Sequence, residues 1–294
     1  MERRKFTSLL TLSAMAMQIG NLKSLENWSQ SLKGSALTPT LFIGHGSPMN
    51  AIEKNEFVQG FQKTASSLPE IQAILVISAH WLTNGTAVTA MDKPKTIHDF
   101  GGFPPELFAQ QYPAPGSPEL AQEIKNLIPD THIHLDHEWG LDHGTWTILK
   151  HFYPEANIPV VQFSIDYRQP LSYHFNLAKQ IAELRKKGVL IIGSGNIVHN
   201  LRAVDFSKIN KVGYGYEWAQ EARAYVNNCI RTENFEALQK IEKGPHALQL
   251  AIPTPDHYIP LLYVLGLKNK DEELQFFNDQ LLAGSLSMTS LKIG

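Results

Sequence analysis

Three apolar runs of β-strand type end at or close to a histidine, and this feature constrains the fold more than any other. The runs and their histidines are Leu41–Ile43 with His45, Ala73–Ser78 with His80, and Val189–Ile192 with His199. Ligand sites of open α/β folds lie at the carboxyl ends of the strands. Three strand ends that each carry a histidine therefore predict one shared site.

Strand-type and helix-type segments alternate along the chain from Thr38 onward. Several strand-type runs are apolar throughout, which is typical of strands buried on both faces. The alternation predicts a single three-layer α/β/α domain with a mostly parallel or mixed central sheet. The predicted strands are Leu41–Ile43, Ala73–Ser78, Ala87–Met91, Val160–Ile165 and Val189–Ile192, with Ser285–Ile293 as an added, antiparallel edge strand.

Two helices carry clear boundary signals. Ser117 followed by Pro118 is typical of a helix start, and this helix is predicted to run to about Ile128. A second helix is predicted over Leu171–Lys187, and it ends at Gly188. Both helices would pack on a face of the sheet and complete the layers.

The overall composition excludes several classes of partner and site. The chain has 294 residues and a formal net charge of −2, so we expect neither a nucleic-acid nor a membrane partner. Cys229 is the one cysteine, which excludes an intrachain disulfide and a cysteine-based zinc site. We expect Cys229 to be a packing residue. The oligomeric state is left open.

The first 36 residues form an N-terminal extension, and residues 37–294 form the expected catalytic domain. Arg3 and Arg4 precede a short apolar stretch, Thr7–Met17, which resembles a twin-arginine export signal. The alternative is an amphipathic N-terminus without a signal function. The location is therefore cytoplasmic, or periplasmic if the segment is a signal. The stretch is too short to cross a membrane as a helix.

Two further histidines have neighbours that suit a ligand site. His257 lies in a turn bracketed by prolines, and His143 lies among glycines and tryptophans. Imidazole is a common ligand of zinc and also suits iron, so the histidines together predict one mononuclear metal site. Candidates for hydrogen-bond partners that fix the imidazole tautomers are Asn196, Asn200, Asp142 and Asp256.

The segment Ile97–Pro104 combines aromatic residues with glycines, and we expect it to be a lid or wall for a flat ligand. The alternative is a rigid surface loop that packs its own aromatic rings. The alternating histidines of His132–His137 could bind a metal, but they also fit the solvated face of a strand, which we expect here. We expect structural or surface roles for three more histidines: His151, His174 and His246. The chain lacks a nucleophile elbow and a dinucleotide fingerprint.

At these motifs the sequence resembles the 4,5-DOPA extradiol dioxygenase-like family, part of the class III extradiol ring-cleavage dioxygenases and of the protocatechuate 4,5-dioxygenase superfamily. The resemblance extends from about Leu41 to the C-terminus, but Phe206–Leu250 matches poorly. The segments that carry it are Gly44–Asn50, Ser78–Trp81, Thr96–Pro104, Tyr112–Pro118, Trp139–Gly144, Gly195–Arg202, Pro253–Tyr258 and Gly284–Met288.

The resemblance implies one divalent metal ion, Zn²⁺ or Fe²⁺, held by His45, His80 and His257. It implies that His199 either binds zinc, as in some members, or acts as an acid and base. His143 matches another histidine of the family site. Many iron enzymes of the superfamily have a glutamate where this chain has His257, and a set of histidines suits zinc at least as well as iron.

The function implied is extradiol cleavage of a catechol such as DOPA by dioxygen, with His199 and His143 as catalytic residues. We expect the substrate wall to consist of His98, Trp81, Phe100 and Tyr258. Two alternatives stay open at this point. One is a zinc hydrolase on the same scaffold, with a zinc-bound water as nucleophile. The other is a zinc-binding protein without enzymatic activity.

Overall fold

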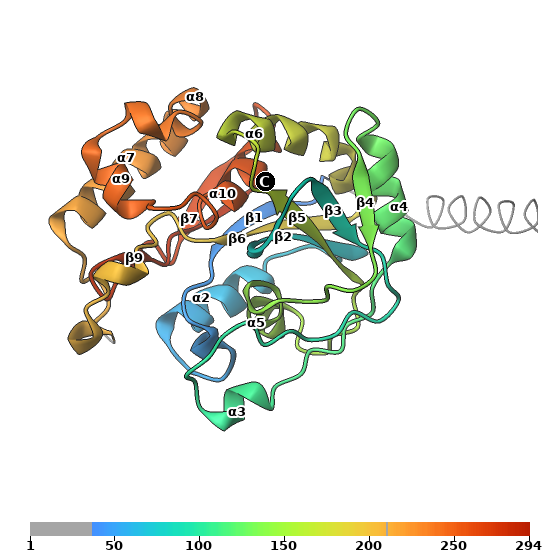
Figure 1. Ribbon diagram of the computed structural model, residues 1–294, viewed down its shortest axis with the longest axis horizontal. Helices are drawn as coiled ribbons and strands as arrows, with labels where there is room; N and C mark the ends of the chain where they lie inside the picture. The colour runs from blue at the N-terminus through green and yellow to red at the C-terminus, as the bar shows by residue number, and fades with distance from the viewer. Residues whose placement is uncertain (1–36, 210) are drawn as a thin grey trace, which may run out of the picture.

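A large twisted sheet lies at the centre of the molecule, with helices on both of its faces (Figure 1). The computed structural model describes residues 37–209 and 211–294. The expected N-terminal extension lies outside the described residues. No helix in the described ranges is long and apolar enough to cross a membrane. The three-layer α/β/α fold is confirmed.

The central sheet has eight strands in the order β4-β3-β5-β2-β6-β1-β10-β7. Strands β5, β2, β6 and β1 are parallel to their neighbours within this group, so their carboxyl ends share one edge. The strands are β1 Thr40–Gly44, β2 Ala73–Thr83, β3 Thr86–Thr89, β4 Ile133–Asp136, β5 Val160–Asp166, β6 Val189–Gly195, β7 Leu274–Phe277 and β10 Ser290–Ile293, with the small pair β8 Leu281–Leu282 and β9 Leu286–Ser287 separate.

Three apolar cores form, and two of them lie on opposite faces of the sheet because successive strand residues point to opposite faces. Ile77 and Ile191 face the core beneath α4, α6 and α10, whereas Val76 and Ile192 face the core beneath α2 and α5. The α-helices are α2 Glu56–Ala65, α3 Pro105–Phe108, α4 Pro118–Leu127, α5 His143–Phe152, α6 Leu171–Gln180, α7 Glu217–Arg231, α8 Phe235–Leu238, α9 His246–Ala251 and α10 Ile259–Gly266. Short 3-10 turns are η1 Pro48–Ala51, η2 Ala182–Lys187, η3 Leu201–Ala203, η4 Phe206–Lys208 and η5 Ile241–Lys243.

Five of the six predicted strands form, whereas Ser285–Ile293 is divided into two short strands, β9 and β10, which belong to different sheets. Strand β10 pairs antiparallel with β1, as expected, yet it lies inside the sheet because β7 pairs with its other side and forms the edge. The helix predicted over 171–187 changes to a 3-10 helix, η2, for its last residues. It ends, as predicted, at Gly188, whose φ of 75° suits glycine.

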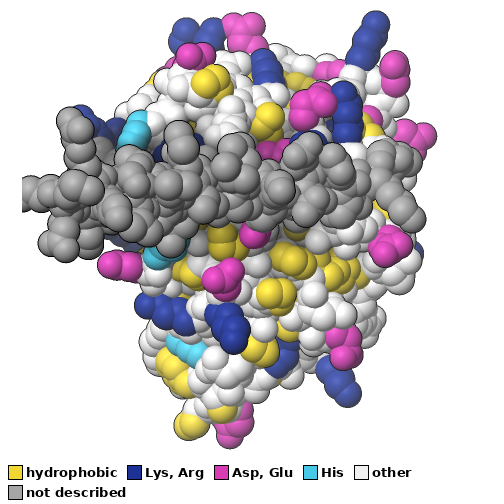
Figure 2. Space-filling view, turned by 90° about the vertical axis from the view of Figure 1, so that its right-hand side faces the viewer, with side chains coloured by type: hydrophobic (Ala, Val, Ile, Leu, Met, Phe, Trp, Pro, Cys, Tyr) yellow, Lys and Arg dark blue, Asp and Glu magenta, His cyan; other side chains and the backbone are white. Residues whose placement is uncertain are grey.

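Side-chain exposure confirms several expectations for individual residues. Cys229 is buried in the core beside α10. His132, His134 and His137 are exposed around β4. Figure 2 shows one face of the molecule, where acidic and basic side chains lie interspersed and hydrophobic side chains form small groups. This mixture agrees with the small net charge.

His174 is a fully buried histidine of α6. Its Nδ1 lies 3.1 Å from the Tyr263 hydroxyl, and its Nε2 has no hydrogen-bond partner among the described residues. Burial lowers the pKa of His174 to about 4, although the nearby charge of Asp166 acts in the opposite direction. The folded protein therefore holds His174 neutral at a pH where the unfolded chain protonates it.

This difference predicts a stability that falls as the pH decreases from 6.5 to about 4. Over that window the unfolded state binds the extra proton, which costs on the order of 3 kcal/mol of unfolding free energy at the lower end. His174→Asn keeps a polar atom for Tyr263 and removes the titration. We expect urea unfolding of this variant to depend less on pH than that of the wild type, and equal slopes would contradict the expectation.

Candidate active site

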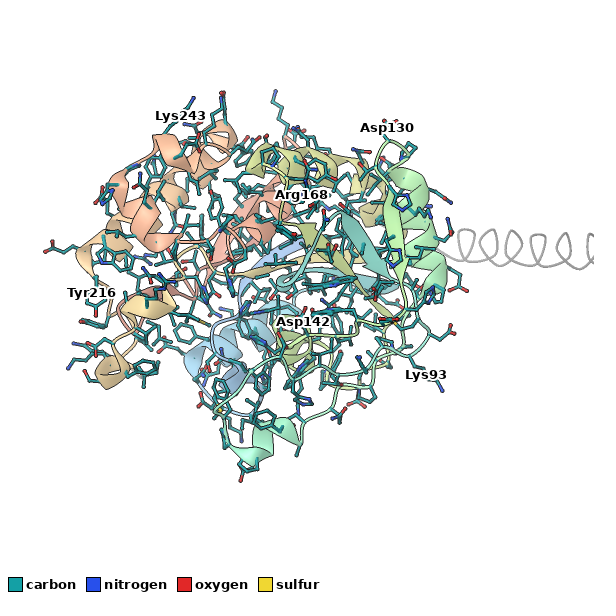
Figure 3. The ribbon with its side chains drawn as sticks, in the orientation of Figure 1. Lys93, Asp130, Asp142, Arg168, Tyr216 and Lys243 are labelled. Atoms are coloured by element: carbon teal, nitrogen blue, oxygen red, sulfur yellow. The ribbon has the colours of Figure 1, made fainter. Side chains whose placement is uncertain are left out.

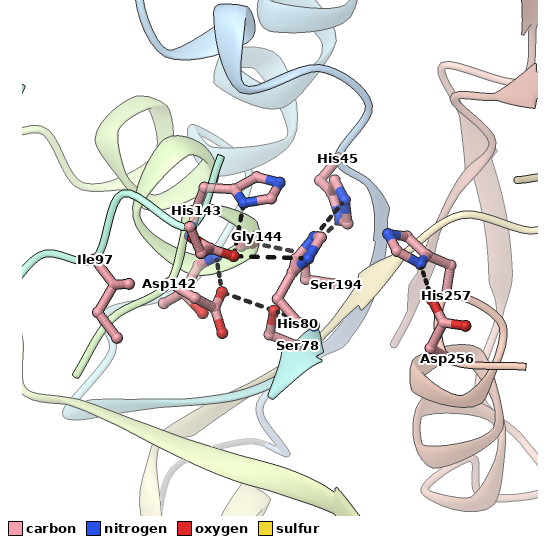
Figure 4. A network of polar contacts seen from close by, with 12 residues as sticks. His45, Ser78, His80, Ile97, Asp142, His143, Gly144, Ser194, Asp256 and His257 are labelled. Atoms are coloured by element: carbon pink, nitrogen blue, oxygen red, sulfur yellow. Dashed lines mark hydrogen bonds and ion pairs between the residues drawn. The ribbon is translucent and has the colours of Figure 1, made fainter. Parts of the chain in front are cut away.

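Three histidines from distant parts of the chain meet at the carboxyl edge of the parallel strands (Figure 4). One ring nitrogen of each of His45, His80 and His257 lies within 4.8 Å of the others. The Nε2 atoms of His45 and His80 are 3.1 Å apart. Two nitrogens at this spacing can both reach one metal ion at the usual distance of about 2.1 Å. The donor set therefore fits a divalent metal ion.

His45 is positioned by the end of β1 and by the neighbouring strand. The backbone N–H of His45 donates to the Gly195 carbonyl, and the side-chain amide of Asn50 donates to the backbone carbonyl of His45. Its Nδ1 lies 3.0 Å from the hydroxyl oxygen of Ser194, and that hydroxyl donates its proton to the Gly144 carbonyl. The Ser194 oxygen must therefore accept from Nδ1–H of His45. This leaves the lone pair on Nε2, which faces the shared space.

His80 lies in β2 where the strand departs from regular pairing. The register with β5 shifts between Ile77 and Leu82, and His80 falls within that stretch. Such irregularities redirect side chains beside functional sites. A methyl group at Gly144 would come within 2.8 Å of the His80 ring, so only glycine at this position avoids a steric clash with that ring.

His257 is brought to the site by close backbone packing before α10. Asn196 N–H donates to its carbonyl over 2.9 Å, and a Cβ at Gly195 would lie only 2.2 Å from the same oxygen. Its Nδ1 makes a short hydrogen bond to the Asp256 carboxylate. Because a carboxylate only accepts, this bond places the proton on Nδ1 and the lone pair on Nε2.

His143 is the first residue of α5 and lies beside this group. The ring centroids of His143 and His80 are 3.8 Å apart. Asp99 accepts two hydrogen bonds from His143, one from the backbone N–H (2.8 Å) and one from Nδ1 (2.9 Å). The helix cap is Asp142, which lies near the centre of the molecule in Figure 3 and accepts from Thr145 N–H.

His199 lies beside the three-histidine group but is not a member of it. Its ring stacks on His257 with centroids 3.5 Å apart and planes 9° apart. A ring nitrogen of His199 also lies within 4.8 Å of ligand atoms of Asp256 and His257. This position leaves His199 free to contact a molecule bound next to the three histidines.

Burial sets the protonation of these groups. Burial first, and then the neighbouring histidines, lower the pKa of His45 and His80 well below the usual value. The same causes lower the pKa of His199 to about 3. Burial opposes ionisation of Asp256, but the hydrogen bond and charge interaction with His257, together with further hydrogen bonds, outweigh it, so the pKa of the carboxyl is lowered. At neutral pH His45, His80 and His199 are thus neutral, and neutral imidazole is the form that binds metals.

The expected substrate wall is only partly assembled around the histidines. Phe100 packs its ring edge-on to His143 with centroids 5.6 Å apart, and His98 contacts Phe100. Trp81 is buried and stacks on Trp139. Tyr258 is fully buried in the core, and its hydroxyl donates to the Leu238 carbonyl. Trp81 and Tyr258 both pack in the protein interior, and their part in a substrate wall stays a prediction.

Of the four expected hydrogen-bond partners of the imidazoles, Asp256 alone contacts a histidine ring of the site. Asn196 and Asn200 donate to backbone carbonyls, and Asp142 bonds to Ser78, Gln162 and the start of α5. Two partners, Asp99 and Ser194, were missed. The sequence features that could have identified them are the carboxylate of Asp99 within the aromatic loop and the position of Ser194 at the end of an apolar strand.

Comparisons with known proteins identify the class to which this site belongs. Residues 39–285 match the model of the catalytic LigB subunit of aromatic ring-opening dioxygenase. The match covers most of the chain, so the protein belongs to this family of ring-opening dioxygenases, and the expected kind of enzyme is confirmed.

Individual relatives agree with the family. The chain is 45% identical to the 4,5-DOPA dioxygenase extradiol of Escherichia coli K12, over 90% of this chain and 97% of that protein. It is 35% identical to the 4,5-DOPA dioxygenase extradiol of Beta vulgaris, over 86% and 95%. It also resembles the crystal structure of an uncharacterized Escherichia coli K12 protein, with a TM-score of 0.76, 41% identity and coverage of 87% and 100%.

The contact between Gly195 and His257 predicts the effect of one added methyl group. In Gly195→Ala the methyl would displace the His257 carbonyl, so we expect a loss of about 1–3 kcal/mol in unfolding free energy and weaker zinc binding. Urea unfolding of the metal-free protein and calorimetric zinc titration measure the two effects. Gly101→Ala is the control, because nothing lies within 4 Å of its added methyl. A folded Gly195→Ala protein with unchanged zinc affinity would contradict this placement of His257.

Proposed function

We propose that this protein cleaves the ring of a catechol such as DOPA with dioxygen, at one divalent metal ion. The observation that carries the proposal is the meeting of three histidines, His45, His80 and His257, beside two further histidines, His143 and His199. The names of the relatives support the catechol and the amino acid DOPA as substrate class.

His45, His80 and His257 would hold the metal ion through the nitrogen atoms that face one another. A ferrous ion held there supplies the redox chemistry between a catechol and dioxygen. In the balanced reaction, one carbon–carbon bond beside a hydroxyl-bearing carbon breaks and both oxygen atoms enter the product. The ends become a carboxylate and an aldehyde, so the reaction requires no external reductant.

His199 and His143 are the groups left to move protons. A catechol has two hydroxyl protons, and an imidazole with a free lone pair accepts one of them when the hydroxyl approaches. At neutral pH, His199 carries such a lone pair because its pKa is lowered. His143 offers Nε2, since its Nδ1 is bonded to Asp99. Phe100, packed against His143, supplies an apolar edge for a flat ring.

To test the proposal directly, metal-free protein is loaded with ferrous iron under anaerobic conditions, and a separate sample is loaded with zinc. After addition of DOPA and air, oxygen uptake and the yellow absorbance of a ring-opened product are followed. We expect both signals in the iron sample and neither in the zinc sample. Absence of both signals with either metal, across a panel of catechols, would overturn the proposal in favour of a zinc hydrolase or a zinc-binding protein.

If His199 transfers a proton, its removal should affect kcat much more than KM. His199→Ala should lower kcat by roughly 10²–10⁴-fold, because a positioned acid or base contributes about this much, and should change KM far less. Steady-state oxygen uptake by the iron-loaded protein measures both constants. His246→Ala is the matched control, because His246 is an exposed histidine of α9. A kcat equal to that of the control would remove His199 from the mechanism.

A further inference from the structure

Asp99 connects the aromatic loop to two histidines of the site. It lies between His98 and Phe100, on the loop that precedes α3. One carboxylate oxygen, Oδ1, accepts from the backbone N–H of His143, and the other, Oδ2, accepts from Nδ1 of the same residue. Oδ2 also lies 3.7 Å from Nδ1 of His80. The Asp99 side chain is 19% exposed, although the residue as a whole, with its backbone, is exposed.

The direction of these bonds determines the tautomer of His143. An ionised carboxylate has no proton to donate, so Nδ1 of His143 must carry a proton, and in the neutral imidazole the lone pair is then on Nε2. Nε2 makes no hydrogen bond to a described residue. Burial raises the pKa of Asp99, but the hydrogen bonds and the charge interaction with His143 together outweigh that effect, so the pKa is lowered and the carboxylate is ionised at neutral pH.

The hydrogen bond from the His143 backbone N–H to Asp99 fixes the orientation of the Asp99 carboxylate relative to the His143 ring. His143 is the first residue of α5, where backbone N–H groups have no partner within the helix. Asp99 satisfies one of them with Oδ1, and this anchors its carboxylate while Oδ2 meets the ring. A single rotation of the His143 side chain would therefore lose the ring bond but not the backbone bond. The backbone bond thus holds the carboxylate in the position at which it accepts a hydrogen bond from the imidazole.

We propose that Asp99 is a positioning residue, which holds His143 in the Nδ1–H tautomer and presents the Nε2 lone pair to the catechol. This inference rests on the proposed function for its catalytic consequence. Its structural part, the tautomer of His143, can be measured without catalysis. Because Asp99 belongs to the loop that carries Phe100, the same segment supplies the apolar edge and the partner of the proton acceptor.

Asp99→Asn is the decisive variant. The amide oxygen can still accept from the His143 backbone N–H, which leaves the amide N–H₂ group facing Nδ1. Nδ1 must then accept, so we expect His143 to change to the Nε2–H tautomer. Nitrogen-15 NMR of histidine-labelled, metal-free protein distinguishes the two tautomers, and the spectrum of His143→Gln assigns the signal. Asp92→Asn is the control, because Asp92 is an exposed aspartate in the preceding loop.

The kinetic expectation is a kcat lowered by about 10²–10⁴-fold in iron-loaded Asp99→Asn, with KM changed far less, because the proton acceptor is lost while the pocket stays. Asp99→Glu keeps a carboxylate, and we expect it to restore part of the rate. A kcat no lower than that of Asp92→Asn would overturn the catalytic part of the inference.

The NMR result decides the tautomer on its own. An Nε2–H tautomer in the wild type, or an unchanged Nδ1–H tautomer in Asp99→Asn, would overturn the inference. If Asp99→Asn does not fold, the wild-type spectrum still gives the first of these results. If the wild type shows no activity on catechols, the proposed function fails, whereas the tautomer measurement continues to test the role of Asp99.

Discussion

The hydroxyl of Ser194 joins three segments of the chain through two hydrogen bonds. It donates to the Gly144 carbonyl in α5, and it accepts from His45 at the end of β1, while Ser194 itself lies in β6. The donated proton can point in one direction only, so the bond to Gly144 determines which nitrogen of His45 faces the site. The parallel pairing of β1 with β6 sets the spacing that makes both bonds possible.

The same arrangement recurs at two other histidines with different acceptors. His257 bonds through Nδ1 to Asp256, and His143 bonds through Nδ1 to Asp99. In each case an oxygen that can only accept holds the proton on the outer nitrogen, and the inner nitrogen is left with a lone pair. Metal ligands of this kind are generally oriented by such outer partners. The site therefore places an ionised carboxylate behind each of two imidazoles, Asp256 behind His257 and Asp99 behind His143.

The sequence was sufficient to predict the apolar strands β1, β2, β3, β5 and β6 and the convergence of the histidines, because long apolar runs and the carboxyl-end rule are local signals. It was not sufficient for contacts between distant segments. Asp99 and His143 are 44 positions apart, and their pairing depends on how the aromatic loop meets the start of α5. Trp81 and Tyr258 were placed in the pocket wall because they adjoin histidines, but neighbours in sequence point in different directions, and both rings are buried. Strand β10 was predicted at the edge because the half-exposed β7 gives a weak pattern.

His257 enters the site 212 positions after His45, with α7, α8 and α9 lying between β6 and the turn that carries it. A metal ion held by both residues would act as a cross-link that closes nearly the whole domain into one ring. The entropy of closing such a loop grows only slowly with its length, so the great separation adds little cost. Because an ion that binds only the folded form stabilises by mass action, its occupancy would protect the domain as a unit, including helices that never touch the ion.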